Sequence, residues 1–389
     1  MKKRWKIQRL EEISEIIMGQ SPKGSSYNKE GHGTPLINGP VEFGRGPFGK
    51  TVQTKFTTQP TKLCLAGDLI LCVRGSTTGK MNIAGSDSCI GRGVAAIRAS
   101  ESQEYLNHYF NFKRSEIYNL GSGSTFPNVS GSVLKAIEVP IPPLAEQEEI
   151  VEVLDKAFAA IDQAKANIEQ NIANAKELFQ SKLNQIFSQK GDGWVEKTLG
   201  ELCVVERGSS PRPIKRYITT DEDGVNWIKI GDIGKQEKYV NSTRQKITKE
   251  GAKRSRFVGI GDFILSNSMS FGRPYIMAIE GYIHDGWFVL RLPEEINPDY
   301  FWQLLASPYL KEQFDDLAAG AIVKNISGDL VKKAIIPVPP IEVQSKVYLE
   351  TEILKEAVDQ VVASYQAKLS ALEELKKSIL QKAFAGELT

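Results

Sequence analysis

The sequence predicts an α+β fold built as a pseudo-twofold internal repeat, with two globular domains that are each followed by one long helix. Three observations predict it: the halves of the chain align with each other, short β-rich runs alternate with helical ones, and each half ends in a long pattern without glycine or proline. The expected boundaries are 1–143 for the first globular domain, 144–188 for its helix, 189–340 for the second domain and 341–389 for its helix.

The repeat is recognised at both ends of each globular segment. Residues 5–22 (WKIQRLEEISEIIMGQSP) align without gaps on residues 194–211 (WVEKTLGELCVVERGSSP), and a GD-x-I-L segment recurs at 67–71 and 261–265. From the PIPP and PVPP sequences at 140–143 and 337–340, the alignment continues at a constant offset as far as Phe187 and Phe384. Between these matches, 25–62 and 215–259 share little beyond turn residues and basic charge. A repeated scaffold with two different surfaces is expected, although duplicated domains also occur purely as stability modules.

The globular segments carry short strand patterns and amphipathic helical patterns. Strands are predicted over 68–73, 94–98, 262–265 and 287–292, where apolar and β-branched residues lie between Gly, Ser, Thr and Pro loops. Helices are predicted over 105–119 and 300–317.

Each proline sequence leads into a helical pattern that is too long for a single globular domain. At about 1.5 Å per residue, some 40 residues give roughly 60 Å. Apolar residues at spacings of three and four predict a seam that needs a partner, and an antiparallel coiled coil between the two helices is the simplest solution because a globular domain separates them. The predicted spacer-helix seam comprises Ile150, Leu154, Ile161, Ile168, Leu178, Val347, Leu354, Val358, Tyr365, Leu372 and Leu375.

Charge is unevenly distributed along the chain, although the net charge is only +2. Residues 1–140 hold 18 basic against 11 acidic residues (+7), and 207–256 hold 13 against 6 (+7), whereas 141–190 hold 5 against 8 (−3). Basic globular surfaces suit a polyanion partner. No membrane span and no leader are expected, because apolar runs are short and the basic start is followed by further charges, so a cytoplasmic location is expected. The scattered Cys and His residues predict neither a metal site nor a disulfide.

Two motifs suggest enzymes but lack the necessary context. Residues 44–51 satisfy GxxxxGK[ST], yet the Thr-rich stretch that follows predicts no helix, so a basic glycine turn is the better interpretation. Residues 297–300 (NPDY) resemble the NPPY motif of amino-methyltransferases without its second proline, and a helix N-terminal turn before Tyr300 is favoured. No carboxylate cluster offers nuclease chemistry, so the chain is expected to have no catalytic residues.

Basic loops remain the best candidates for function, because lysine and arginine neutralise phosphates while arginine and asparagine also read base edges. Arg212, Asn267 and Arg273 are the candidate base readers. The full set of DNA-binding candidates is Lys23, Arg45, Lys50, Arg74, Lys80, Arg92, Arg212, Lys215, Arg216, Lys253, Arg254, Arg256, Asn267 and Arg273.

The duplicated GD-x-I/L-L segment, the proline sequences followed by Gln147 and Gln344, and the closing KAFAGEL resemble the type I restriction enzyme specificity subunit family over essentially the whole chain. The resemblance implies two target-recognition domains spaced by two helices, and double-stranded DNA, two modification subunits and restriction subunits as partners. It also implies that those partners, and not this chain, use S-adenosylmethionine, ATP and Mg. In one departure from the family pattern, the first helix closes with FSQKGDG, which is expected to form a linker.

The resemblance and the repeat together predict a split, asymmetric DNA target with one half-site per domain, and termini close enough for circular permutation. Two alternatives stay open. One is a self-contained DNA methyltransferase or ATPase component, and the other is a coiled-coil adaptor without a DNA role.

Overall fold

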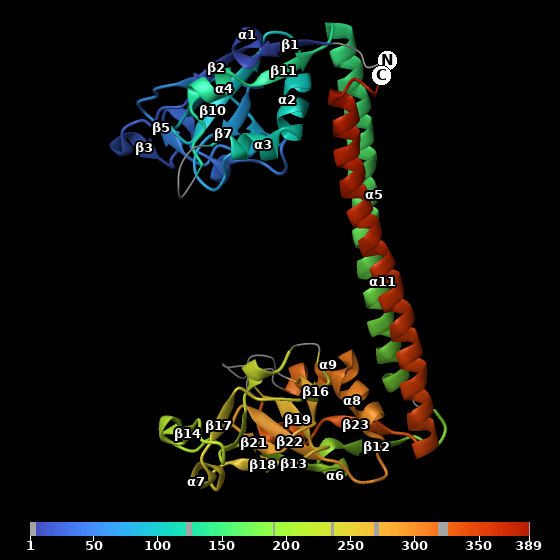
Figure 1. The fold of residues 1–389 in the computed structure, drawn as a ribbon. Coiled ribbons are helices and arrows are strands. Elements are labelled where there is room, and N and C mark those ends of the chain that lie inside the picture. The colour runs from blue at the N-terminus through green and yellow to red at the C-terminus, as the bar shows by residue number, and fades with distance from the viewer. Residues whose placement is uncertain are drawn as a thin grey trace. The chain divides into compact units, whose positions relative to one another are not determined.

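The computed structural model divides the chain into two compact units, which are described separately (Figure 1). Unit 1 comprises Met1–Ile168 with Gln366–Thr389, and unit 2 comprises Glu169–Tyr365. The residues that the structure describes are 5–121, 127–189, 191–234, 237–267, 272–317 and 326–388. The two long helices are α5 (Leu144–Ser188) and α11 (Ile341–Phe384), and each contributes residues to both units.

Unit 1 contains three described sheets. β1 (Lys6–Arg9) pairs with β11 (Glu138–Ile141), and a four-stranded sheet has the order β2-β10-β7-β8. A five-stranded sheet has the order β3-β5-β4-β9-β6, with β4 and β9 parallel. The remaining bounds are α1 (Leu10–Ile13), β2 (Ser14–Met18), η1 (Gly24–Ser26), β3 (Tyr27–Asn28), β4 (Thr34–Ile37), η2 (Pro40–Glu42), β5 (Phe56–Thr57), β6 (Leu63–Cys64), β7 (Leu69–Cys72), β8 (Met81–Ile83), β9 (Ser88–Ile90), β10 (Val94–Ala99), α2 (Gln103–Phe112), α3 (Arg114–Asn119) and α4 (Gly131–Lys135).

Unit 2 repeats this topology and adds one strand, β16, beside β20 at the edge of the sheet that corresponds to β2-β10-β7-β8. β12 pairs with β23, one sheet has the order β13-β22-β19-β20-β16, and the other has the order β14-β17-β15-β21-β18 with β15 and β21 parallel. The bounds are β12 (Val195–Thr198), α6 (Leu199–Leu202), β13 (Val204–Arg207), η3 (Ile214–Arg216), β14 (Ile218–Thr219), β15 (Val225–Ile228), η4 (Ile230–Asp232), β16 (Tyr239–Val240), β17 (Gln245–Ile247), α7 (Lys249–Ala252), β18 (Arg256–Val258), β19 (Phe263–Ser266), β20 (Pro274–Met277), β21 (Gly281–Ile283), β22 (Trp287–Arg291), α8 (Pro298–Ala306), α9 (Pro308–Leu317), α10 (Gly328–Val331) and β23 (Ile335–Val338).

The repeat therefore extends further than the sequence alignment indicated. The segments 25–62 and 215–259, which share little sequence, supply strands in corresponding positions to the sheets β3-β5-β4-β9-β6 and β14-β17-β15-β21-β18. Strand order depends on alternating burial and turn positions, and very different side chains satisfy both. The scaffold is thus conserved within the chain even where its surface differs.

The GD-x-I-L segment has a structural explanation in both units. Gly67 and Gly261 have φ of 94° and 87°, a left-handed conformation that favours glycine. The buried Asp68 carboxylate receives two hydrogen bonds of 2.8 Å from Arg98 on β10, and Asp262 lies 3.4 Å from Arg291 on β22. The motif closes a turn and joins two neighbouring strands of the sheet.

Two predicted helices are each divided. The predicted helix 105–119 is α2 followed by α3, with the break at Lys113, whose φ and ψ of −82° and 3° leave the helical region. The predicted helix 300–317 is α8 followed by α9, because Pro308 forces Ser307 into an extended conformation (ψ 155°). The four predicted strands correspond to β7, β10, β19 and β22 and are confirmed.

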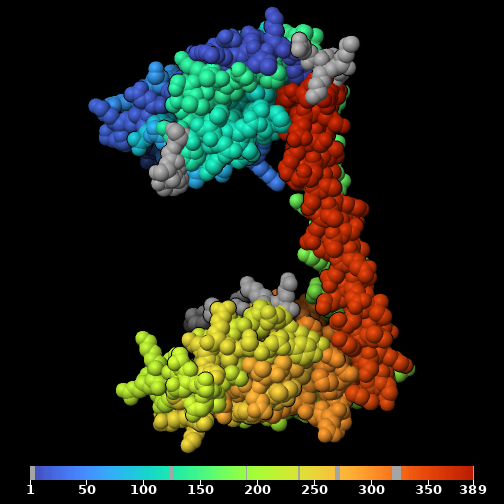
Figure 2. All heavy atoms as spheres, viewed as in Figure 1, coloured from blue at the N-terminus to red at the C-terminus, as the bar shows by residue number. Residues whose placement is uncertain are grey.

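The long helices pair antiparallel, as predicted. In unit 1, Lys165 pairs with Glu373 and Asp162 with Lys376, so that residue numbers fall along α11 as they rise along α5. Figure 2 shows the last turns of α11, in red, against the globular part of unit 1. In unit 2, Leu183 near the end of α5 shares a core with Val347 near the start of α11.

The predicted seam is wrong at two positions. Leu178 is 65% exposed and Leu375 is 47% exposed, whereas the other nine are buried or half-buried. Steps of three and of four residues both stay on one face of a helix, so the sequence pattern does not distinguish neighbouring positions. In the structure, Phe179 and Lys376 lie on the buried face in place of Leu178 and Leu375. The Lys376 ammonium lies 4.5 Å from the Phe158 ring centre, so its aliphatic stem covers a seam position that leucine was expected to fill.

Candidate nucleic-acid interface

Four of the candidate cations in unit 1 gather at one end of the β2-β10-β7-β8 sheet. Lys23 follows β2, Arg74 and Lys80 flank the β7–β8 turn, and Arg92 precedes β10. The backbone connects these loops directly, because Arg92 N–H donates to Ser21 Oγ at 3.2 Å and Val73 N–H donates to Gly93 O at 3.0 Å. All four side chains are exposed. Together they form a cationic surface at the ends of adjacent strands.

Arg45 and Lys50 lie elsewhere in unit 1. Lys50 forms a β-bridge with Ile83, the last residue of β8, whereas Lys80 lies just before Met81, the first residue of that strand. The loop around them is filled from within, because the buried Asn82 amide donates to Gly44 O and Gly46 O at 3.3 and 3.0 Å and accepts from Gly44 N at 3.1 Å. Residues 51–55 are irregular and Phe56–Thr57 form β5, so no helix begins directly after Lys50 and Thr51. A phosphate loop needs a helix N-terminus at that point, so the interpretation as a glycine turn is confirmed.

In unit 2 the corresponding cations surround the loop after β13. Ser209 Oγ donates to Arg254 O at 3.1 Å, and the Arg254 guanidinium lies 5.6 Å from the Tyr217 ring centre, beside η3 with Lys215 and Arg216. Arg212 extends from the same loop and approaches Asp285 at 3.5 Å. Lys253 precedes Arg254 and is exposed. Five candidates are therefore brought together.

Three further candidates have different surroundings. Asn267 is 2% exposed and its amide donates to Asp285 O at 2.8 Å, so the prediction that it reads a base is wrong: the side chain is already used inside the fold. Arg256 forms an ion pair with Glu206 at 3.0 Å, next to the Arg291–Glu206 pair, and so connects β18 with β13. Arg273 is half-buried at the start of β20, which is the position of Lys80 in the repeat.

Asp285 is a candidate interface residue that sequence reasoning about basic residues does not find. In unit 2 it occupies the place that Arg92 has in unit 1, because each residue is hydrogen-bonded to the equivalent serine. Arg92 N–H donates to Ser21 Oγ, and Ser210 Oγ donates to the Asp285 carboxylate at 2.6 Å. The hydrogen bond from Ser210 holds the pKa of Asp285 below its ordinary value, so that it is a stable anion. Aligning GRG at 91–93 with HDG at 284–286 was the available signal. Equivalent loop positions thus carry opposite charges.

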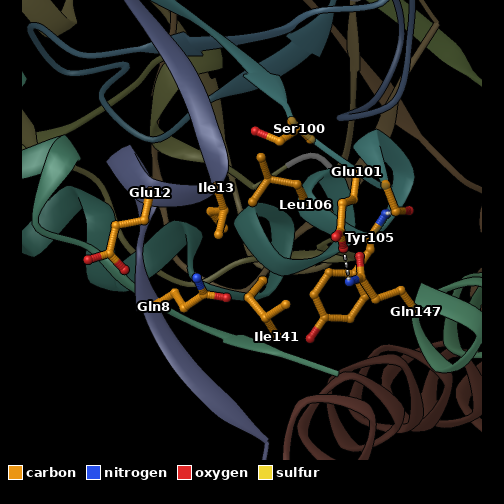
Figure 3. Close-up of a pocket in the computed structure, with 11 residues that line it drawn as sticks. Gln8, Glu12, Ile13, Ser100, Glu101, Tyr105, Leu106, Ile141 and Gln147 are labelled. Carbon is orange, nitrogen blue, oxygen red and sulfur yellow. Dashed lines mark hydrogen bonds between the residues drawn. The ribbon is translucent and has the colours of Figure 1, made fainter. Parts of the chain in front are cut away.

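The joint between each globular part and its long helix is also repeated. Tyr105 donates to Pro140 O and Tyr300 to Pro337 O, both at 2.7 Å. The buried Gln147 donates to Pro142 O at 3.0 Å, and Gln344 donates to Pro339 O at 2.9 Å. In unit 1 a pocket of about 140 Å³ adjoins this joint, with Gln8, Tyr105 and Gln147 among its lining residues (Figure 3). These contacts fix the direction in which the helix leaves.

In the part of the chain that the structure describes, no group of three or more His, Cys, Asp and Glu residues is arranged to hold a metal ion. Among the same residues, no helix is both long and apolar enough to cross a membrane. Asn297 of the NPDY sequence is the N-cap of α8, and its Oδ1 accepts from Asp299 N and Tyr300 N at 2.9 and 3.1 Å, which confirms the predicted helix start.

Comparison with known proteins then decides the family. The model of the type I restriction modification DNA specificity domain matches residues 2–174 and again 191–381. The chain belongs to this family. Its two matches correspond to the two copies of the internal repeat, so the predicted family is confirmed.

Individual relatives agree with the family match. A Methanocaldococcus jannaschii protein assigned as the MjaX type I restriction enzyme specificity subunit is 35% identical over 44% of this chain, and the alignment spans only 41% of that protein. The EcoBI specificity subunit of Escherichia coli is 24% identical over 98% of this chain and 85% of its own length. A chain solved in work on complex assembly and conformational transition of the type I R-M system matches with a TM-score of 0.75 at 19% identity, over 99% of this chain and 98% of that one, which shows a shared fold.

Proposed function

We propose that this chain is the DNA specificity subunit of a type I restriction-modification complex, and that each unit reads one half of a split, asymmetric target. The observation that carries the proposal is the repeated topology with different loop side chains. The same strand ends present Lys23 and Arg92 in unit 1 but Arg212 and Asp285 in unit 2. One scaffold with two sets of contact groups suits the recognition of two different half-sites.

The chemistry of the loops divides the work between affinity and selectivity. Exposed lysines such as Lys23, Lys80 and Lys215 act as point charges against phosphates, which gives a salt-dependent affinity. Arg212 and Arg273 offer the planar fork that pairs with a guanine edge, and a carboxylate such as Asp285 accepts from the cytosine amino group. The first group positions the unit on the duplex, and the second discriminates between bases.

Catalysis is assigned to partners in this proposal. Two modification subunits would use S-adenosylmethionine, and restriction subunits would use ATP and Mg, while this chain binds none of these cofactors and is not an enzyme. The supporting observation is that the joints around Gln147 and Gln344 are built alike, which would offer two equivalent docking surfaces.

The test is to co-express the chain with its modification subunit and to map methylated adenines by single-molecule sequencing. A two-part motif is expected. Replacing residues 25–62 by residues 216–255, which hold the equivalent strands, should alter the first half of the motif and leave the second unchanged. A continuous motif, no motif, or a change in both halves would overturn the proposal.

A control addresses the enzyme alternative directly. The purified chain alone, given S-adenosylmethionine or ATP with DNA, should show no turnover. Turnover would instead support the methyltransferase or ATPase alternative, and absence of sequence-specific DNA binding with the modification subunit present would support the adaptor alternative.

A further inference from the structure

In each unit, one segment leaves the sheet that contains the parallel strand pair (β4 with β9, or β15 with β21), runs beside the neighbouring sheet and returns. In unit 1 this segment lies between β4 and β5, and in unit 2 between β15 and β17. Ile83 N–H donates to Gly49 O and Ile276 N–H donates to Lys238 O, both at 2.9 Å. Gly49 and Lys238 therefore hold equivalent places, with Phe48 one residue earlier.

The unit 1 segment contacts the junction between α2 and the long helix α5. The ring centres of Phe48 and His108 are 4.7 Å apart, and His108 Nε2 lies 2.9 Å from Asp155 Oδ1 on α5. Phe158, one turn further along α5, packs at the edge of the same imidazole at 5.6 Å. Phe48 thereby touches a side chain that is itself bound to the helix.

The unit 2 segment reaches the same junction with a different side chain. The Lys238 ammonium lies 2.6 Å from Asp299 Oδ1 at the start of α8. It also lies 5.1 Å from the Trp302 ring centre and 5.3 Å from that of Tyr348 on the long helix α11. An ammonium that is held by a carboxylate and aromatic faces, away from water, is attracted more strongly than an exposed one.

The junction beneath these contacts is repeated as well. His108 and Asp155 in unit 1 correspond to Gln303 and Glu352 in unit 2, where the Gln303 amide donates to Glu352 Oε1 at 2.9 Å. Each unit therefore joins its short helix to its long helix by a polar bridge from a buried side chain, His108 or Gln303, and the returning segment is attached beside this bridge. An aromatic contact by Phe48 in unit 1 and a charged contact by Lys238 in unit 2 attach equivalent segments at equivalent places. This recurrence indicates that the attachment matters more than the side chain that makes it.

We propose that Phe48 and Lys238 are positioning residues for target recognition. Each attaches the sheet with the parallel strand pair in its unit (β3-β5-β4-β9-β6 or β14-β17-β15-β21-β18) to the base of the long helix, and so sets where that sheet presents its DNA-reading side chains. The inference rests on the proposed function. Neither residue needs to contact DNA, because each acts through the placement of loops carried by strands of the same sheet, such as η3 and the turn before β18 in unit 2.

The test is the methylation map of full-length variants co-expressed with the modification subunit. Lys238→Ala should raise methylation at sites with one mismatch in the second half of the motif by about tenfold, the size of a single lost contact. Selectivity in the first half should stay as in the wild type. Lys238→Arg keeps the charge and the ring contacts and should restore most of the selectivity.

Two further variants separate positioning from a loss of fold. Lys197→Ala removes an exposed lysine on β12 and should leave both halves unchanged. Phe48→Ala should give the mirror result, with relaxed selectivity in the first half alone. Equal loss in both halves, or unchanged selectivity in Lys238→Ala with a normal two-part wild-type motif, overturns the positioning proposal alone. A wild type without a two-part motif overturns the proposed function with it.

Discussion

At the scale of single residues, His108 combines burial with an incomplete set of partners. Its Nε2 is paired with Asp155, whereas its Nδ1 is buried without a hydrogen-bond partner in the structure. A neutral imidazole tolerates this arrangement, but a protonated one would bury an N–H without an acceptor. Burial lowers the pKa of His108, and the hydrogen bond that Nε2–H donates to the Asp155 carboxylate offsets this only in part.

This arrangement predicts a loss of stability in acid. Because the pKa of His108 is lower in the folded protein than the ordinary value of 6.5, its contribution is present above pH 6.5 and is lost as the pH falls below it. Asp155 on α5, Glu104 on α2 and Lys376 on α11 face the ring and are all retained in His108→Gln, which copies Gln303. Urea unfolding between pH 7.5 and 5.5 should show a smaller acid loss in His108→Gln than in the wild type. Identical pH profiles would contradict the assignment.

Asn297 gives a second residue-scale prediction. Its side chain accepts two backbone N–H groups at the start of α8 and also donates to Ser345 Oγ at 3.2 Å. Asn297→Ala should destabilise the protein by about 1–2 kcal/mol, as loss of an N-cap does elsewhere. Asn297→Asp keeps the acceptor and should cost less. Chemical denaturation measures both, and equal losses for the two variants would show that capping is not the reason.

At the scale of elements, the buried row of the long helices distinguishes residues that hydrophobicity alone does not. Leu154→Ala removes a fully buried side chain of α5 and should cost about 2–5 kcal/mol. Leu178→Ala removes an equally large but 65% exposed side chain from the same helix and should change stability by less than about 0.5 kcal/mol. Thermal unfolding of the two variants tests which residues face the partner helix. Similar losses of stability would mean that Leu178 is buried, as the sequence predicted.

The same scale shows what the sequence could predict. Period and length sufficed for both long helices, and short apolar runs between turn residues sufficed for β7, β10, β19 and β22. The common topology of the sheets β3-β5-β4-β9-β6 and β14-β17-β15-β21-β18 was hidden because their strands are only two to four residues long, too short to show a period. The candidate interface could be predicted only in part. Exposed cations could be recognised by residue type, but the burial of Asn267 and the position of Asp285 depend on contacts between loops that are distant in the sequence.

At the scale of the whole molecule, the two ends of the described chain belong to one unit. Trp5 and Leu388 pack against the same core cluster, which also contains Leu10 and Phe384. The ends are therefore held by unit 1 itself, and a flexible linker of about ten residues, with a mean span of roughly 17 Å, should join them without disturbing that core.

A circular permutant tests whether chain continuity matters to function. New ends between Gly191 and Gly193 would lie after α5 and before β12, where the described residues form neither strand nor helix. Co-expressed with the modification subunit, this permutant should methylate the wild-type motif. A second permutant that is opened between Ala95 and Ala96, inside the buried strand β10, should fail to fold. If the first permutant folds but methylates a different motif or none, then recognition depends on the covalent connection between α5 and β12, and the two units are not independent readers.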